Sequence, residues 1–144
     1  MSVFFMISAC NQGHHHDSES DTTSASHGDT TLTLNNGERW VVDSLTKDNF
    51  DNLETSVDMF YVDPFPPIDS YQAFGNDVSQ ALNTMISQCK MKGEAHEVLH
   101  RWMNPLISQS NELKNIQDTL LARKLADSIH VRVGRFTNYF KATP

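Results

Sequence analysis

The sequence predicts an all-α fold: an up-and-down bundle of about four helices, preceded by a short extended or hairpin lead-in and a disordered N-terminal tether. Three observations support this prediction. From about residue 46 onward, apolar side chains recur every three or four residues, as on one face of a helix. Segments that contain proline or glycine divide this pattern into pieces of helical length. The residues before about position 31, by contrast, are too polar to bury a core of their own.

The lead-in is the stretch TLTLNNGERWVVD, residues 31–43. Its Asn-Asn-Gly segment lies between two short apolar runs, which is typical of a tight turn. Two short strands alone are only marginally stable. We therefore expect an extended lead-in that packs Trp40 against the helices.

The first helix is expected to begin near Thr46 and to end before the proline-rich segment 63–69. Its apolar face follows steps of three and four residues: Phe50, Leu53, Val57 and Phe60. Ser70 is the predicted N-cap of the second helix. The apolar positions of that helix are Tyr71, Phe74, Val78, Leu82, Met85 and Cys89.

At two residues in the middle of the chain, the sequence allows two different assignments of the helix boundaries. Gly93 either ends the second helix in a left-handed conformation or lies inside a longer helix. Pro105 either kinks a helix or marks the first turn after a break. A final helix is predicted from about Asn115 to Phe140. Its inward stripe is Ile116, Leu120, Ile129, Val133, Phe136 and Phe140.

The N-terminus indicates an exported lipoprotein. The segment ISAC, which ends at Cys10, resembles the lipobox of bacterial lipoproteins, in which the cysteine is lipidated. We expect residues 1–9 to be part of a signal peptide, 10–31 a tether and 32–144 the helical-bundle domain. The protein would then be anchored by lipid at the periplasmic side of the cell envelope. If the N-terminus is not a leader, the expected location is the cytoplasm.

Charge and motifs exclude several classes of function. The net charge of −7 argues against nucleic acid and against an anionic membrane surface as partners. The common nucleotide-binding, zincin and serine-hydrolase motifs do not occur. A Cys–His pair is present, but no oxyanion-hole signature accompanies it. We therefore do not expect an enzyme.

The stretch CKMKGEAHEVLHRWM, residues 89–103, carries the candidate site. If the helix runs through Gly93, five potential ligands lie on one side of it, within a sector of the helical wheel about 60° wide: Met85, Cys89, His96, His100 and Met103. If Gly93 breaks the helix, His96 and His100 still share a face, and Cys89 must meet them across a turn.

These residue types suit a soft or borderline transition metal. Two histidines one turn apart can bind one ion, and a thiolate with thioethers favours copper(I) or, in a mixed set, zinc. The predicted ligands are Cys89, Met91, His96, His100 and Met103. His130 is a further candidate, and Glu94 and Glu97 are candidate acceptors for imidazole N–H groups. Alternatively, methionine and cysteine are ordinary core residues and no metal binds.

Three segments together resemble a group of small, largely uncharacterised bacterial envelope proteins or lipoproteins. They are LNNGERWVVD, CKMKGEAHEVLHRWMNPL and the C-terminal NYF, and the resemblance covers most of residues 33–140. The shared core is C-x-M-K-G-x-x-H-x-x-L-H-x-W. This resemblance implies an exported helical bundle with an association with heavy-metal handling, and it carries over Cys89, Met91, His96 and His100.

The sequence thus leads to two functional hypotheses. The first is an envelope lipoprotein that binds copper or zinc for buffering, sensing or delivery rather than catalysis. The second is a metal-free structural or interaction module that binds another envelope protein. In the second hypothesis Trp40, Trp102 and Tyr139 are the expected anchors.

Overall fold

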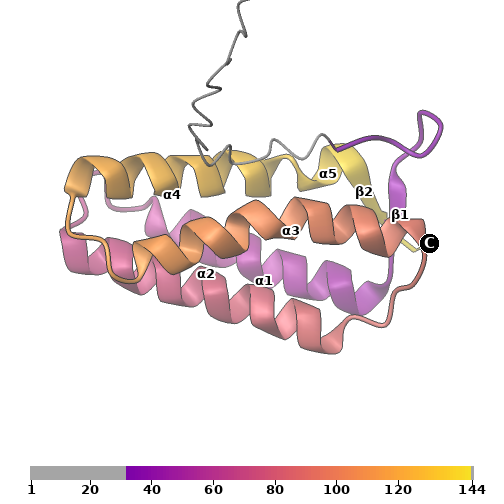
Figure 1. Ribbon diagram of the computed structural model, residues 1–144, viewed down its shortest axis with the longest axis horizontal. Helices are drawn as coiled ribbons and strands as arrows, with labels where there is room; N and C mark the ends of the chain where they lie inside the picture. The colour runs from indigo at the N-terminus through magenta and orange to yellow at the C-terminus, as the bar shows by residue number, and fades with distance from the viewer. Residues whose placement is uncertain (1–31, 144) are drawn as a thin grey trace, which may run out of the picture.

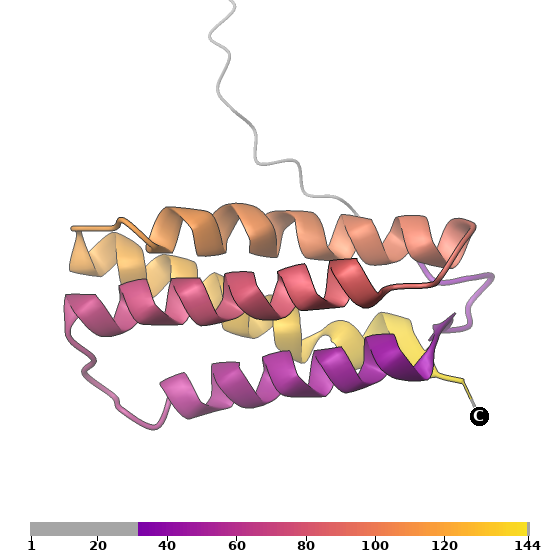
Figure 2. The same cartoon turned by 90° about the horizontal axis from the view of Figure 1, so that it is seen from below.

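The computed structural model describes residues 32–143, and the predicted up-and-down bundle is confirmed (Figures 1 and 2). Four long helices run side by side with alternating direction, and a short helix and two short strands complete the fold. The elements are β1 (Trp40–Val42), α1 (Ser44–Phe60), α2 (Ile68–Gln88), α3 (Glu94–Leu113), α4 (Thr119–Gly134), α5 (Phe136–Tyr139) and β2 (Phe140–Ala142). The predictions for residues 1–31, lipidation of Cys10 included, lie outside the described residues.

The lead-in forms the predicted turn but not a hairpin sheet. Asn36 and Gly37 have φ of 52° and 90°, and the backbones of Asn35 and Glu38 bond each other at 2.8 and 2.9 Å. Strand β1, however, pairs in parallel with β2 at the far end of the chain, with Trp40 opposite Phe140. The lead-in therefore fastens the C-terminus to the bundle.

Two helix starts differ from the prediction. Helix α1 begins at Ser44, because the carboxylate of Asp43 accepts a hydrogen bond from the Thr46 backbone N–H at 2.7 Å. Helix α2 begins at Ile68 with Pro67 as its N-cap, so the assignment of Ser70 as N-cap was wrong. Proline already has a fixed φ and lacks an N–H, and it therefore costs nothing just ahead of a helix.

The final helix is shorter than predicted. Helix α4 begins after Asp118, whose carboxylate accepts from the backbone N–H groups of Leu120 and Leu121. This cap places Leu120 in the first turn with 66% of its side chain exposed, so its assignment to the inward stripe was wrong. The helix ends at Gly134, and Phe140 lies in a strand rather than in a helix.

Aromatic rings fill the core at the end of the bundle near the strands. Phe136 stacks on Phe50 at 3.9 Å and on Phe140 at 4.7 Å between ring centroids. Trp102 is fully buried among them, and its indole N–H donates to the Arg132 carbonyl at 3.1 Å. Trp40 is 6% exposed. Both tryptophans are core residues, which contradicts their assignment as interface anchors.

Helices α2 and α3 approach each other closely at Gly75. A Cβ atom at this position would lie 2.6 Å from Leu113 Cβ and 2.8 Å from the Ser110 carbonyl oxygen. Only glycine permits this spacing without a shift of the helices. Within residues 32–143, no helix has the length and apolar character needed to cross a membrane.

Candidate metal centre

The candidate centre lies where α2 turns into α3, and Gly93 creates the turn. Helix α2 ends at Gln88, Cys89 is extended, and Gly93 takes a φ of 72° just before α3 begins. A positive φ is costly for other residues and free for glycine. A continuous helix through Gly93 is therefore excluded. The five potential ligands from Met85 to Met103 consequently do not share one face of a single helix.

The turn is held against the first residues of α1. The Thr46 hydroxyl donates to the Met91 sulfur at 3.6 Å, and the Asn49 amide donates to Gln88 Oε1 at 3.0 Å. Thr46 and Asn49 are both buried. The loop of Cys89 to Gly93 is consequently a fixed part of the bundle end.

Asp43 ties the same loop to the start of α1. Burial by itself raises the pKa of Asp43, but hydrogen bonds from Thr46 and from the Lys90 backbone outweigh it, and the pKa lies below its usual value. An ionised Asp43 therefore serves both as the N-cap of α1 and as an acceptor for the loop that follows α2.

Cys89 and His96 meet across this turn. The Cys89 sulfur lies 3.5 Å from His96 Nδ1, and Cys89 is a free, half-buried thiol. A tetrahedral ion with metal–sulfur and metal–nitrogen bonds of about 2.3 and 2.0–2.1 Å holds its donors about 3.5 Å apart. The observed spacing equals one edge of such a site. It also suits a thiol–imidazole hydrogen bond.

His100 completes a compact cluster with His96. The two rings lie one helical turn apart on α3, with centroids 4.4 Å apart and planes at 66°. Both histidines are half-buried, so solvent and small ions reach them. The structure thus places Cys89 against His96, and His96 against His100, although the helix is broken.

The other predicted ligands lie in different surroundings. Met103 and Met85 are fully buried in the core. Met91 is half-buried in the loop with its sulfur against Thr46. The ring of His130, on α4, packs on Tyr61 at 4.4 Å rather than on the histidines of α3. Of these methionines, Met91 is therefore the one that lies outside the fully buried core.

No ready-made chelate is present in the described part of the chain. No three His, Cys, Asp or Glu side chains there are already arranged around one point as metal ligands. Glu94 and Glu97 are exposed in the first turn of α3, where their charge suits the helix N-terminus. Binding of one ion by Cys89, His96 and His100 would therefore require their side chains to rearrange.

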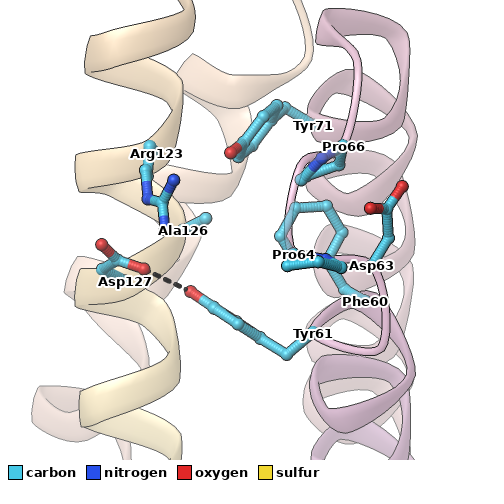
Figure 3. A pocket seen from close by; sticks show the side chains of 9 residues that line it. All are labelled: Phe60, Tyr61, Asp63, Pro64, Pro66, Tyr71, Arg123, Ala126 and Asp127. Atoms are coloured by element: carbon cyan, nitrogen blue, oxygen red, sulfur yellow. Dashed lines mark hydrogen bonds between the residues drawn. The ribbon is translucent and has the colours of Figure 1, made fainter.

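A second polar cluster, which the sequence did not indicate, lies between α4 and the segment that joins α1 to α2 (Figure 3). The Tyr61 hydroxyl donates to Asp127 Oδ1 at 2.9 Å. Burial, and then this hydrogen bond, raise the pKa of Tyr61 above its ordinary value. No sequence signal joins two residues that lie 66 positions apart.

Searches of protein families, curated proteins and solved structures found no match to this chain. The resemblance to envelope lipoproteins therefore stays a prediction.

Proposed function

We propose that this protein binds a copper or zinc ion through Cys89, His96 and His100, with Met91 assisting, and that it buffers, senses or delivers the metal. The observation that carries the proposal is the distance of 3.5 Å between the Cys89 sulfur and His96 Nδ1. Two donors at this separation need no backbone movement to share one ion.

The donor set favours an ion that prefers soft or borderline ligands. Thiolate, imidazole and thioether together suit copper(I), and thiolate with two imidazoles also suits zinc. Zinc would take water or a partner's side chain as its fourth ligand. Binding would release the proton of the Cys89 thiol, so affinity falls at low pH.

The position of the cluster is consistent with metal exchange. Its residues are half-buried at one end of the bundle, where an ion can enter without unfolding of a helix. An incomplete ligand shell leaves an open position for a donor or acceptor protein. Lipid anchoring at Cys10 is part of the same proposal and concerns residues outside the described range.

The test is to measure the metal bound per chain in a protein that begins at Leu32, which keeps every described helix and strand. This truncation removes His14 to His16 and His27, whose imidazoles could also bind metal. We expect one equivalent of copper(I) or zinc per chain. Cys89→Ser and the double variant His96→Ala/His100→Ala should lose it, whereas the control His130→Ala should retain it. Equal, substoichiometric binding by all four proteins would refute the proposal.

The second candidate function is a metal-free interaction module. It is favoured by exposed apolar side chains at the opposite end of the bundle, where Met59, Val62 and Phe65 are 68%, 76% and 83% exposed. In that case the contact of Cys89 with His96 is a hydrogen bond inside the fold. Loss of structure in Cys89→Ser without any metal binding by the wild type would favour this second candidate.

A further inference from the structure

A pocket of about 250 Å³ lies between α4 and the segment that joins α1 to α2, far from the metal cluster along the bundle. Figure 3 shows Arg123 and Asp127 of α4 along one wall and Pro64 and Pro66 along the other. A volume of this size accommodates a small organic molecule.

One wall of the pocket is apolar and rigid. Pro64 and Pro66 line it together with the ring of Phe60, which stacks on Phe74 at 4.2 Å between ring centroids. Proline rings restrict their own φ and that of their neighbours. This wall is therefore formed before any ligand arrives and offers a flat surface to an apolar group.

Two polar groups at the pocket, Tyr71 of α2 and Arg123 of α4, make no hydrogen bond or ion pair with other described residues. Tyr71 is only 4% exposed, its hydroxyl points into the pocket, and within residues 32–143 this hydroxyl makes no hydrogen bond. The Arg123 side chain likewise makes no ion pair within the described range. A hydroxyl and a guanidinium are donors that favour an oxygen acceptor.

The two carboxylates of the pocket are already engaged. Asp127 accepts the hydrogen bond of Tyr61, and Asp63 accepts from the Phe65 backbone N–H at 2.9 Å inside its own turn. In the view of Figure 3, Tyr71 and Asp127 stand toward opposite ends of the pocket with Arg123 between them.

We propose that this pocket binds a small monocarboxylate with an apolar body. The carboxylate accepts hydrogen bonds from the Arg123 guanidinium and the Tyr71 hydroxyl, and the apolar body packs on Pro64 and Pro66. The site is independent of the metal proposal, since it shares no residue with Cys89, His96 or His100.

The test is a titration of the full-length, isotope-labelled protein with sodium benzoate, followed by amide NMR shifts. We expect saturable shifts confined to residues 60–71 and 119–130, with a dissociation constant on the order of 1 mM for so small a probe. Arg123→Gln should weaken binding about tenfold because it removes the positive charge, and Tyr71→Phe about threefold to tenfold because it removes the hydroxyl donor. The control Arg135→Gln, at the far end of α4, should bind as the wild type does.

Two matched probes separate charge from shape. Benzylamine and benzyl alcohol keep the ring, and we expect neither to produce saturable shifts. Tyr71→Phe keeps the aromatic ring against Phe60, and an unchanged thermal midpoint shows that the pocket is intact. Tighter binding of benzylamine, absence of saturable shifts with benzoate, or equal affinity in Arg123→Gln would each overturn the proposal.

Discussion

The two ends of the bundle differ in how their side chains come together. At one end, the loop between α2 and α3 joins Cys89 to His96, residues close in sequence. At the other end, Tyr61 reaches Asp127 across 66 positions of the chain. The contact between Cys89 and His96 thus joins residues only seven positions apart, whereas the pocket exists only because α4 packs beside the end of α1.

Removal of Trp102 should most damage the end of the bundle that carries Cys89, His96 and His100. Trp102 is fully buried, and Trp102→Ala should lower the free energy of unfolding by about 3–5 kcal/mol because a cavity replaces the indole. Urea unfolding measures this loss. Leu120→Ala is the control, since Leu120 is 66% exposed and should change stability by no more than about 0.5 kcal/mol. Similar effects of both variants would contradict the burial of Trp102.

Metal binding should stabilise the same end. If the native cluster alone binds zinc, a free ion concentration about 100 times the dissociation constant raises the free energy of unfolding by about 2.7 kcal/mol. Urea unfolding of the chain from Leu32 onward, with and without zinc, checks this value. In Cys89→Ser the increase should vanish, and an equal increase there would show that zinc binds elsewhere.

Gly75→Ala should loosen the contact between α2 and α3. The new Cβ would lie 2.6 Å from Leu113 Cβ, and such overpacking costs about 1–3 kcal/mol. Gly134→Ala is a matched control, because a Cβ there meets nothing within 4 Å. Thermal unfolding of the two variants should therefore diverge. An unchanged midpoint in Gly75→Ala would mean that the helices are not in close contact at this position.

Tyr61→Phe should have the smallest effect, at the end with the pocket. Loss of its hydrogen bond to Asp127 should cost about 1 kcal/mol near neutral pH. The pKa of Tyr61 is raised in the folded protein, so above about pH 10 the unfolded state loses this proton first. Wild-type stability should then fall as pH rises, and the fall should be weaker in Tyr61→Phe. Identical pH dependence of both proteins would contradict the raised pKa.

Much of the fold could be predicted because helical periodicity records which face is buried. The apolar positions Phe50, Leu53 and Val57 of α1 are all buried, as expected. The start of α4 was missed because Asp118 caps it, and a cap shifts every position on the helical face. Pairing of β1 with β2 was missed as well, since pairing of distant segments has no local signature.

The candidate site was predicted in part for the same reason. The spacing of His96 and His100 guarantees a shared face on any helix, and their rings do lie 4.4 Å apart. The spacing from Cys89 could not decide whether the thiol would reach them. That depended on the backbone of Gly93, which is compatible with more than one conformation.

Local sequence patterns account for the helices, for the turn at Asn36 and Gly37, and for the placement of two histidines on one helix face. Each of these follows from side chains within a few residues of one another. Tertiary structure alone decided that Cys89 contacts His96, that β2 pairs with β1, and that Tyr71 and Arg123 face one pocket. Those arrangements depend on how helices pack, and packing is set by the burial of the whole core rather than by local preference.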